Sequence, residues 1–150
     1  MGTKTGNVKT EKGVIIVAYK NPRNPRFVIL NRKKNWEGWE LPKGHLEKDD
    51  YRETVRLELK EEAGINEVHI REIEELDFTA EWSFEDGGKE IKREYKAFIV
   101  QLSENTFIDV NSNPHDEHEQ GFFFRKEDAK SLLTHKNNIE VLEKAVSKIE

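Results

Sequence analysis

The chain contains no cysteine, and only one methionine and four prolines occur among its 150 residues. Without cysteine it can form no disulfide, no zinc–thiolate site and no thiol nucleophile. Long hydrophobic runs are also missing: the longest spans residues 14–19, whereas a transmembrane helix needs about 20 apolar residues. The first residues lack the apolar stretch of a secretory signal. We therefore expect a cytoplasmic protein that makes no contact with a membrane.

Charge, by contrast, is abundant. Charged residues make up 37% of the chain, against about 25% in a typical globular protein, and hydrophobic residues make up 35%. The 25 basic and 30 acidic residues give a net charge of −5, which argues against stable binding to nucleic acid. A length of 150 residues suits one domain. We predict a single domain over residues 1–150, with residues 1–12 as a loose polar lead-in.

Several segments have the composition of β-strands. They are either rich in β-branched and apolar residues, as buried strands are, or alternate between apolar and polar residues, as half-buried strands do. We expect strands at residues 13–20, 26–31, 78–84, 91–102 and 122–124. An amphipathic stripe from Ile139 to Ile149 predicts a C-terminal helix. Strands mixed with helices in the middle and at the end of the chain favour an α/β/α or α+β fold.

A helix in the middle of the chain has clear start and stop signals. Asp50 can cap its first turn, and Glu53 completes a capping box three residues later. The helix should end at Ala63, because Gly64 suits the left-handed conformation that follows a helix. Val55, Leu59 and Ala63 recur every four residues and predict one buried stripe.

Three glutamates on this helix are the strongest chemical signal. Glu58, Glu61 and Glu62 project from one side of the helix, which we expect to face away from the apolar stripe. Like charges at this spacing repel one another, unless a cation lies between them. Oxygen ligands without sulfur or imidazole suit Mg²⁺ or Mn²⁺. The alternative is a solvated helix face, which is the usual place for a run of charges.

The segment around these glutamates resembles the signature of the Nudix hydrolases. Gly44 matches the first glycine of that signature, and residues 58–65, ELKEEAGI, match its second half without a gap. The resemblance covers most of the chain and implies an α/β/α sandwich with a mixed sheet between helices. It implies hydrolysis of a nucleotide by a water that a bound divalent cation activates.

Two features depart from the signature. Leu57 stands where the family has an arginine, and the segment between Gly44 and Leu57 is one residue shorter than in the motif. Asp49 or Asp50 therefore occupies the place of the first glutamate. In the family this arginine and glutamate are thought to brace the loop against the helix. Both have changed together, so we interpret the difference as a changed structural brace.

The resemblance also assigns roles. It implies that Glu58 and Glu62 bind Mg²⁺, or Mn²⁺ as a substitute, with Glu61 beside them and the backbone carbonyl of Lys43 as a further ligand. The three glutamates would then be catalytic. The general base stays open between Glu58 and a carboxylate of the loop at residues 116–120, of which Glu119 is our candidate.

Among Nudix enzymes, the chain most resembles the asymmetrical diadenosine tetraphosphate hydrolases, which release ATP and AMP. Residues 39–47, WELPKGHLE, and residues 117–129 are similar to runs of that group. The group has an adenine-stacking tyrosine where this chain has Ala97. Tyr95, on the same face of the strand, can stack instead, although an ordinary place in the sheet is an equal alternative.

The likeness implies a nucleotide as the partner. The substrate-binding residues that we expect are Gly44, His45, Arg93, Tyr95 and His118, with Arg93 at the place of a phosphate-binding lysine. For Trp82, Phe84 and Phe122 we expect packing in the core.

Two further functions remain as alternatives. The first is Nudix hydrolysis of an oxidised nucleoside triphosphate, a nucleotide sugar or an RNA 5′ end. The second is a Nudix-fold binding module without catalysis, which Leu57 and the short loop would favour and the intact glutamates oppose. The sequence leaves the oligomeric state open.

Overall fold

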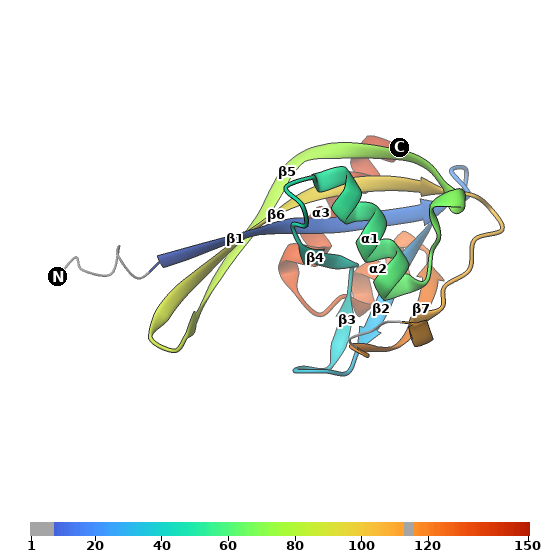
Figure 1. Ribbon diagram of the computed structural model, residues 1–150. Coiled ribbons are helices and arrows are strands. Elements are labelled where there is room, and N and C mark those ends of the chain that lie inside the picture. The colour runs from blue at the N-terminus through green and yellow to red at the C-terminus, as the bar shows by residue number, and fades with distance from the viewer. Residues whose placement is uncertain (1–7, 113–115) are drawn as a thin grey trace.

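The computed structural model describes residues 8–112 and 116–150 (Figure 1). Its strands are β1 (Val8–Lys20), β2 (Arg26–Arg32), β3 (Gly38–Glu40), β4 (Lys43–His45), β5 (Ile70–Asp86), β6 (Lys89–Leu102) and β7 (His118–Phe124). Its α-helices are α1 (Tyr51–Ala63), α2 (Lys126–Leu132) and α3 (Lys136–Ile149), and short 3₁₀ turns occur at Glu67–His69 and Val110–Ser112. None of the helices in these ranges is long and apolar enough to cross a bilayer.

The strands form one mixed sheet in the order β3-β2-β1-β6-β5, with β7 added to β2 and β4 added to β1. β1 runs parallel to β6 and antiparallel to its other neighbours. Along the edge opposite β6, β1 pairs with β4 at residues 13–15 and with β2 only at residues 19–20. The short strand β4 and the loop after it are therefore fixed against the centre of β1.

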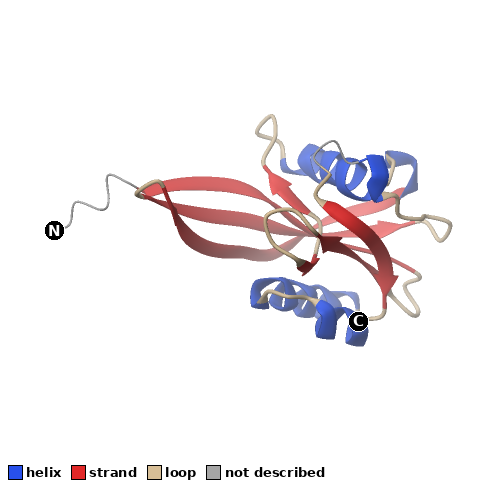
Figure 2. Ribbon diagram, turned by 90° about the horizontal axis from the view of Figure 1, so that it is seen from below, coloured by secondary structure: helices blue, strands red, loops and turns tan. Residues whose placement is uncertain are grey.

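Helices lie on both sides of the sheet (Figure 2). Alternate residues of β1 face opposite sides, as in any strand: Ile15 and Val17 join the core that α3 covers with Leu142, and Ile16 joins the core that α1 covers with Leu59. Burial on both faces explains why this strand is a continuous apolar run. The predicted α/β/α sandwich with a mixed sheet is confirmed.

Helix α1 follows the prediction closely. Its N-cap is Asp50, whose side chain accepts a hydrogen bond from the Glu53 N–H at 3.0 Å. Gly64 ends the helix with φ of 66°, and the following Ile65 N–H bonds back to the Leu59 carbonyl at 3.0 Å. The expected apolar stripe from Val55 to Ala63 is buried.

The strands at the outer end of the sheet are longer than expected. β1 begins at Val8, so the expected loose lead-in is wrong for residues 8–12, while residues 1–7 lie outside the described chain. The outer ends of β1, β6 and β5 form a three-stranded ribbon that projects beyond the helices (Figure 1). Backbone pairing and ion pairs such as Arg93–Glu11 hold this ribbon together. Strands of this kind need no run of hydrophobic residues, so the sequence gives no sign of their full length.

Two aromatic residues that we expected in the core are exposed. The exposed fractions of Phe84, on the outer ribbon, and Phe122, on β7, are 38% and 45%. Trp82 is partly buried and packs against the core as expected. Phe84 differs because it lies further out on the ribbon that projects beyond the helices, where it is not part of the core cluster that includes Trp82.

Candidate active site

A cleft of about 570 Å³ lies where β4, the last turns of α1 and the outer ribbon come together. Acidic, basic and three aromatic side chains line it. The lining residues are Arg32, Lys34, Asn35, Trp36, Lys43, Gly44, His45, Glu47, Glu58, Glu61, Glu62, Phe84, Arg93, Tyr95 and Glu117.

Helix α1 places two carboxylates at the inner end of this cleft. Glu58 and Glu62 have exposed fractions of only 9% and 5%. They form a buried stripe with Thr54, next to the apolar stripe and not on the opposite face, so the expected position away from the core is wrong. Gly44 of β4 lies against Glu58, and a Cβ atom at Gly44 would collide with the Glu58 carboxylate. A glycine is therefore required for β4 to approach the helix.

The electrostatic environment of these carboxylates opposes their ionisation. Burial, reinforced by the charges of Glu61 and Glu117, raises the pKa of Glu58 to about 8. Burial and the nearby charges of Glu40 and Glu58 raise the pKa of Glu62 well above its ordinary value, against the backbone N–H of Lys43, which donates to Glu62 Oε1 at 3.1 Å. Among the described residues, no cationic side chain forms an ion pair with either carboxylate.

The donor set fits a hard divalent cation. Within residues 8–112 and 116–150, no three acidic or histidine side chains are already arranged as a metal cluster. Mg²⁺, however, usually takes only one or two carboxylates and completes its shell with water and phosphate oxygens. Glu58 and Glu62 supply two buried carboxylates without a cationic partner, and Glu61 lines the same cleft. A divalent cation here would supply the positive charge that these groups lack.

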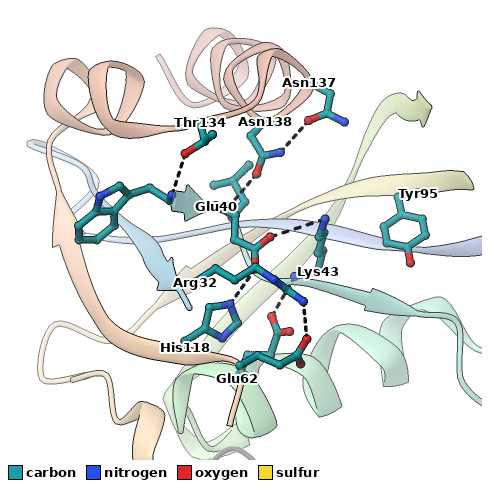
Figure 3. Close-up of polar contacts among 12 residues, drawn as sticks. Arg32, Glu40, Lys43, Glu62, Tyr95, His118, Thr134, Asn137 and Asn138 are labelled. Atoms are coloured by element: carbon teal, nitrogen blue, oxygen red, sulfur yellow. Dashed lines mark hydrogen bonds and ion pairs between the residues drawn. The ribbon is translucent and has the colours of Figure 1, made fainter. Parts of the chain in front are cut away.

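A third buried carboxylate lies behind the cleft and, unlike the first two, has basic side chains beside it. The Glu40 side chain is completely buried; its Oε2 accepts from Arg32 Nη1 at 3.0 Å and lies 2.7 Å from His118 Nε2, and its Oε1 lies 3.6 Å from Lys43 Nζ (Figure 3). Burial alone would raise the pKa of Glu40, but His118, Lys43 and Arg32 outweigh burial and lower it. Glu40 thus stays ionised and serves as a structural anchor. Asn138 of α3 fixes the next residue by accepting from the Leu41 N–H at 2.8 Å.

Comparison with known proteins gives this arrangement a family. The model of the NUDIX domain matches residues 9–145. The chain belongs to the Nudix family. A search of the curated proteins found no match.

Solved structures of Nudix proteins share the fold. A Caenorhabditis elegans Ap4A hydrolase in a binary complex is 22% identical, with a TM-score of 0.72 and coverage of 93% of this chain and 97% of the other. The Escherichia coli dihydroneopterin triphosphate pyrophosphohydrolase is 18% identical, with a TM-score of 0.72 and coverage of 93% and 99%. The NUDIX domain of Shewanella oneidensis NrtR, solved with ADP-ribose, is 14% identical, with a TM-score of 0.71 and coverage of 94% and 89%. At these identities the likeness shows the fold alone.

The Nudix loop between β4 and α1 is closed without the arginine–glutamate pair of the signature. The Thr54 hydroxyl accepts from the Glu47 N–H at 2.8 Å and lies 2.8 Å from the Asp50 carbonyl oxygen. Lys48 and Asp49 adopt positive φ angles of 53° and 56°, which tightens the chain where it is one residue short. Thr54 therefore connects the loop to the helix in this Nudix protein.

The loop before β7 brings a different carboxylate to the cleft from the one we expected. Glu119 is exposed and outside the cleft lining, whereas Glu117 lines it and accepts from Arg32 Nη2 at 2.9 Å. The reason is a β-bulge: Asn31 pairs with Gln120 and Arg32 with His118, which leaves Glu119 as the extra residue. His118 points inward to Glu40 with no exposed side-chain surface, a position that does not support the expected contact of His118 with substrate.

On the outer ribbon, Tyr95 is not available for stacking. Only 2% of it is exposed; its ring packs edge-on against Trp82 at 4.9 Å, and its hydroxyl lies 3.3 Å from His45 Nδ1. Burial raises the pKa of Tyr95 to about 12. The position of Tyr95 does not support the expected stacking of adenine on its ring, although Tyr95 borders the cleft, as do Gly44, His45 and Arg93.

Proposed function

We propose that this Nudix protein is a Mg²⁺-dependent pyrophosphohydrolase whose substrate is a nucleoside polyphosphate, with diadenosine tetraphosphate, cleaved to ATP and AMP, as the preferred one. The observation that carries this proposal is the pair of buried carboxylates, Glu58 and Glu62, at the inner end of a cleft that basic side chains also line. The cleft thus combines carboxylates that have no cationic partner with basic side chains that can bind phosphate. The fold shared with an Ap4A hydrolase supports the choice of substrate.

In this proposal Glu58 and Glu62, with Glu61 and the Lys43 carbonyl as further candidates, would hold the divalent cation. When bound, the cation would orient and acidify a water and neutralise charge on the phosphates. The proposed hydrolysis forms one bond from the water oxygen to phosphorus and breaks one bond from phosphorus to the bridging oxygen. The leaving phosphate keeps that electron pair, and the proton of the water passes to a carboxylate.

Two carboxylates are candidates for this proton. Glu58 lies on the helix among the proposed ligands, and Glu117 lines the same cleft from the loop before β7, where Arg32 Nη2 donates to it at 2.9 Å. We favour Glu117, because Glu58 is one of the proposed ligands of the divalent cation, whereas Glu117 lines the same cleft outside that ligand set. Lys43 and Arg93, which also line the cleft, would bind the phosphate oxygens.

A substrate panel tests this function. The purified protein is incubated with Mg²⁺ and, separately, with diadenosine tetraphosphate, an oxidised nucleoside triphosphate, ADP-ribose and a capped RNA, and the products are separated by chromatography. We expect equimolar ATP and AMP from diadenosine tetraphosphate. Formation of two ADP, or cleavage of another substrate only, would overturn the preferred substrate. Binding of panel members without any hydrolysis would indicate the non-catalytic binding module.

A further inference from the structure

One exposed aromatic side chain stands in the wall of the cleft. The large hydrophobic residues that are exposed in the described chain are Val8, Val68, Phe84, Phe107 and Phe122. Phe84 alone among these five lines the cleft. Exposing an aromatic ring to water is unfavourable, and an exposed apolar surface in a binding cleft commonly serves binding.

Phe84 is held in a fixed arrangement on the outer ribbon. The Arg93 guanidinium lies over its ring, with Cζ 4.8 Å from the centroid. Glu11 fixes that guanidinium in turn, because Arg93 Nε donates to Glu11 Oε1 at 2.9 Å. Glu11 and Arg93 are direct neighbours in the parallel pairing of β1 and β6. A planar cation and an aromatic ring are both surfaces on which nucleobases stack.

Phe84 lies far along β5 from the end of the cleft that holds Glu58 and Glu62. Tyr95, next to His45 and β4, pairs with Ala80 on β5. Phe84 lies four residues further along β5, which corresponds to about 13 Å of strand. The basic side chains of Lys43 and Arg93 line the same cleft. A base on Phe84 would therefore be joined to a phosphorus near Glu58 by a chain of several phosphates.

We propose that Phe84, backed by Arg93 and Glu11, is the platform on which a nucleobase of the substrate stacks. This inference rests on the proposed function and deepens it, because a stacking site at Phe84 would favour nucleotides with a long phosphate chain. Stacking accepts any base, since every base has a π-face. The site therefore selects substrates by their phosphate chain and is tolerant of base identity.

Direct binding tests the platform independently of catalysis. The probes are a non-hydrolysable, methylene-bridged diadenosine tetraphosphate and inorganic tripolyphosphate, titrated in the presence of Mg²⁺. We expect Phe84→Ala to weaken binding of the dinucleotide about 10-fold or more and to leave binding of tripolyphosphate unchanged. Phe84→Trp should retain dinucleotide affinity. Phe107→Ala, which removes an exposed ring outside the cleft, is the control and should change neither.

Turnover provides the second measurement. With the hydrolysed nucleotide, Phe84→Ala should raise KM about 10-fold and change kcat by less than about twofold. If Phe84→Ala weakens the binding of the dinucleotide and of tripolyphosphate equally, or weakens neither, the proposed stacking on Phe84 is wrong even if the protein hydrolyses nucleotides. If the wild-type protein hydrolyses nothing, the proposed function fails, while a selective loss of dinucleotide binding would still support stacking on Phe84.

Discussion

His118 and Glu40 contact each other wholly inside the protein: His118 Nε2 lies 2.7 Å from Glu40 Oε2, and neither side chain has exposed surface. Arg32 joins them at 3.0 Å from the same oxygen. The Glu40 carboxylate thus compensates the charge of the buried Arg32 guanidinium inside the protein. Arg32 in turn reaches Glu117 at 2.9 Å in the cleft, so the buried network sets the position of a cleft carboxylate.

The first prediction concerns the stability that this network provides. Glu40→Ala leaves the buried Arg32 guanidinium with Glu117, at the cleft, as its acidic partner and removes the partner of His118 inside the protein. It should therefore lower the free energy of unfolding by about 3–5 kcal/mol. Glu143→Ala breaks an exposed ion pair with Lys130 and should cost less than about 1 kcal/mol. Denaturant unfolding followed by circular dichroism compares the two variants. Equal losses would mean that the Glu40 network is no stronger than a surface pair.

The second prediction separates two carboxylates of the loop before β7. Glu117→Gln should lower kcat at least about 10-fold, because the cleft loses the proposed proton acceptor. Glu119→Gln should leave kcat within about twofold, since the bulge places Glu119 outside the cleft. Steady-state kinetics and the pH profile of kcat test both variants. The reverse order of effects would restore Glu119 as the candidate base and reject the placement of Glu117.

These two residues also illustrate what the sequence can predict. The sequence predicts helix α1 almost to the residue, because its cap, its apolar stripe and its terminal glycine are local signals. Within the candidate loop at residues 116–120, the sequence does not single out Glu117, because the bulge opposite Arg32 comes from pairing between distant strands. No pattern within residues 116–120 reveals which of two carboxylates is the extra one.

The positions of Tyr95 and Phe84 on the outer ribbon also differ from what the sequence predicts. Tyr95 is buried because Gly13 of the neighbouring strand leaves room for its ring, and a Cβ atom at Gly13 would collide with that ring. Phe84, with the same alternation in sequence, lies past the end of the covering helix and is exposed. Strand periodicity predicts which face a residue is on, but not how far the opposing layer extends.

The third prediction concerns the proposed metal ligands. Glu62→Gln removes one of the two buried carboxylates and should lower turnover at least about 100-fold, while the fold is retained because the amide fills the same space. Glu53→Gln, at the start of the same helix and outside the cleft, should keep full turnover. Isothermal titration with Mn²⁺ should show a parallel loss of metal affinity for the Glu62 variant alone. Unchanged turnover of that variant would remove Glu62 from the mechanism.

The fourth prediction is a pH dependence of stability in the metal-free protein. The folded-state pKa of Glu58, about 8, lies above the ordinary value of 4.5. The folded state therefore binds more protons than the unfolded state between these values, and stability falls as the pH rises through this range. The expected slope is about 1.4 kcal/mol per pH unit for each such carboxylate.

Urea denaturation with a chelator, at intervals from about pH 5 to pH 8, measures this slope. Glu58→Gln should reduce it, and addition of Mg²⁺ to the wild-type protein should raise stability most at the upper end, where the carboxylates are ionised. A slope that Glu58→Gln leaves intact would show that other groups cause it. Stabilisation by Mg²⁺ that is equal at both ends of the range would argue against binding at these carboxylates.

The last prediction concerns the close approach of β4 to helix α1. Gly44 lies so near Glu58 that an added methyl group would collide with the carboxylate. Gly44→Ala should therefore displace Glu58 and lower turnover by at least about 10-fold, because small displacements at a catalytic site are costly. Gly87→Ala provides the matched control: it strains the hairpin turn, where φ is 60°, but a Cβ atom there meets no other atom. This control should lose about 1 kcal/mol of stability and keep full turnover. If both alanine variants lost turnover equally, the effect would come from general destabilisation and not from the contact between β4 and Glu58.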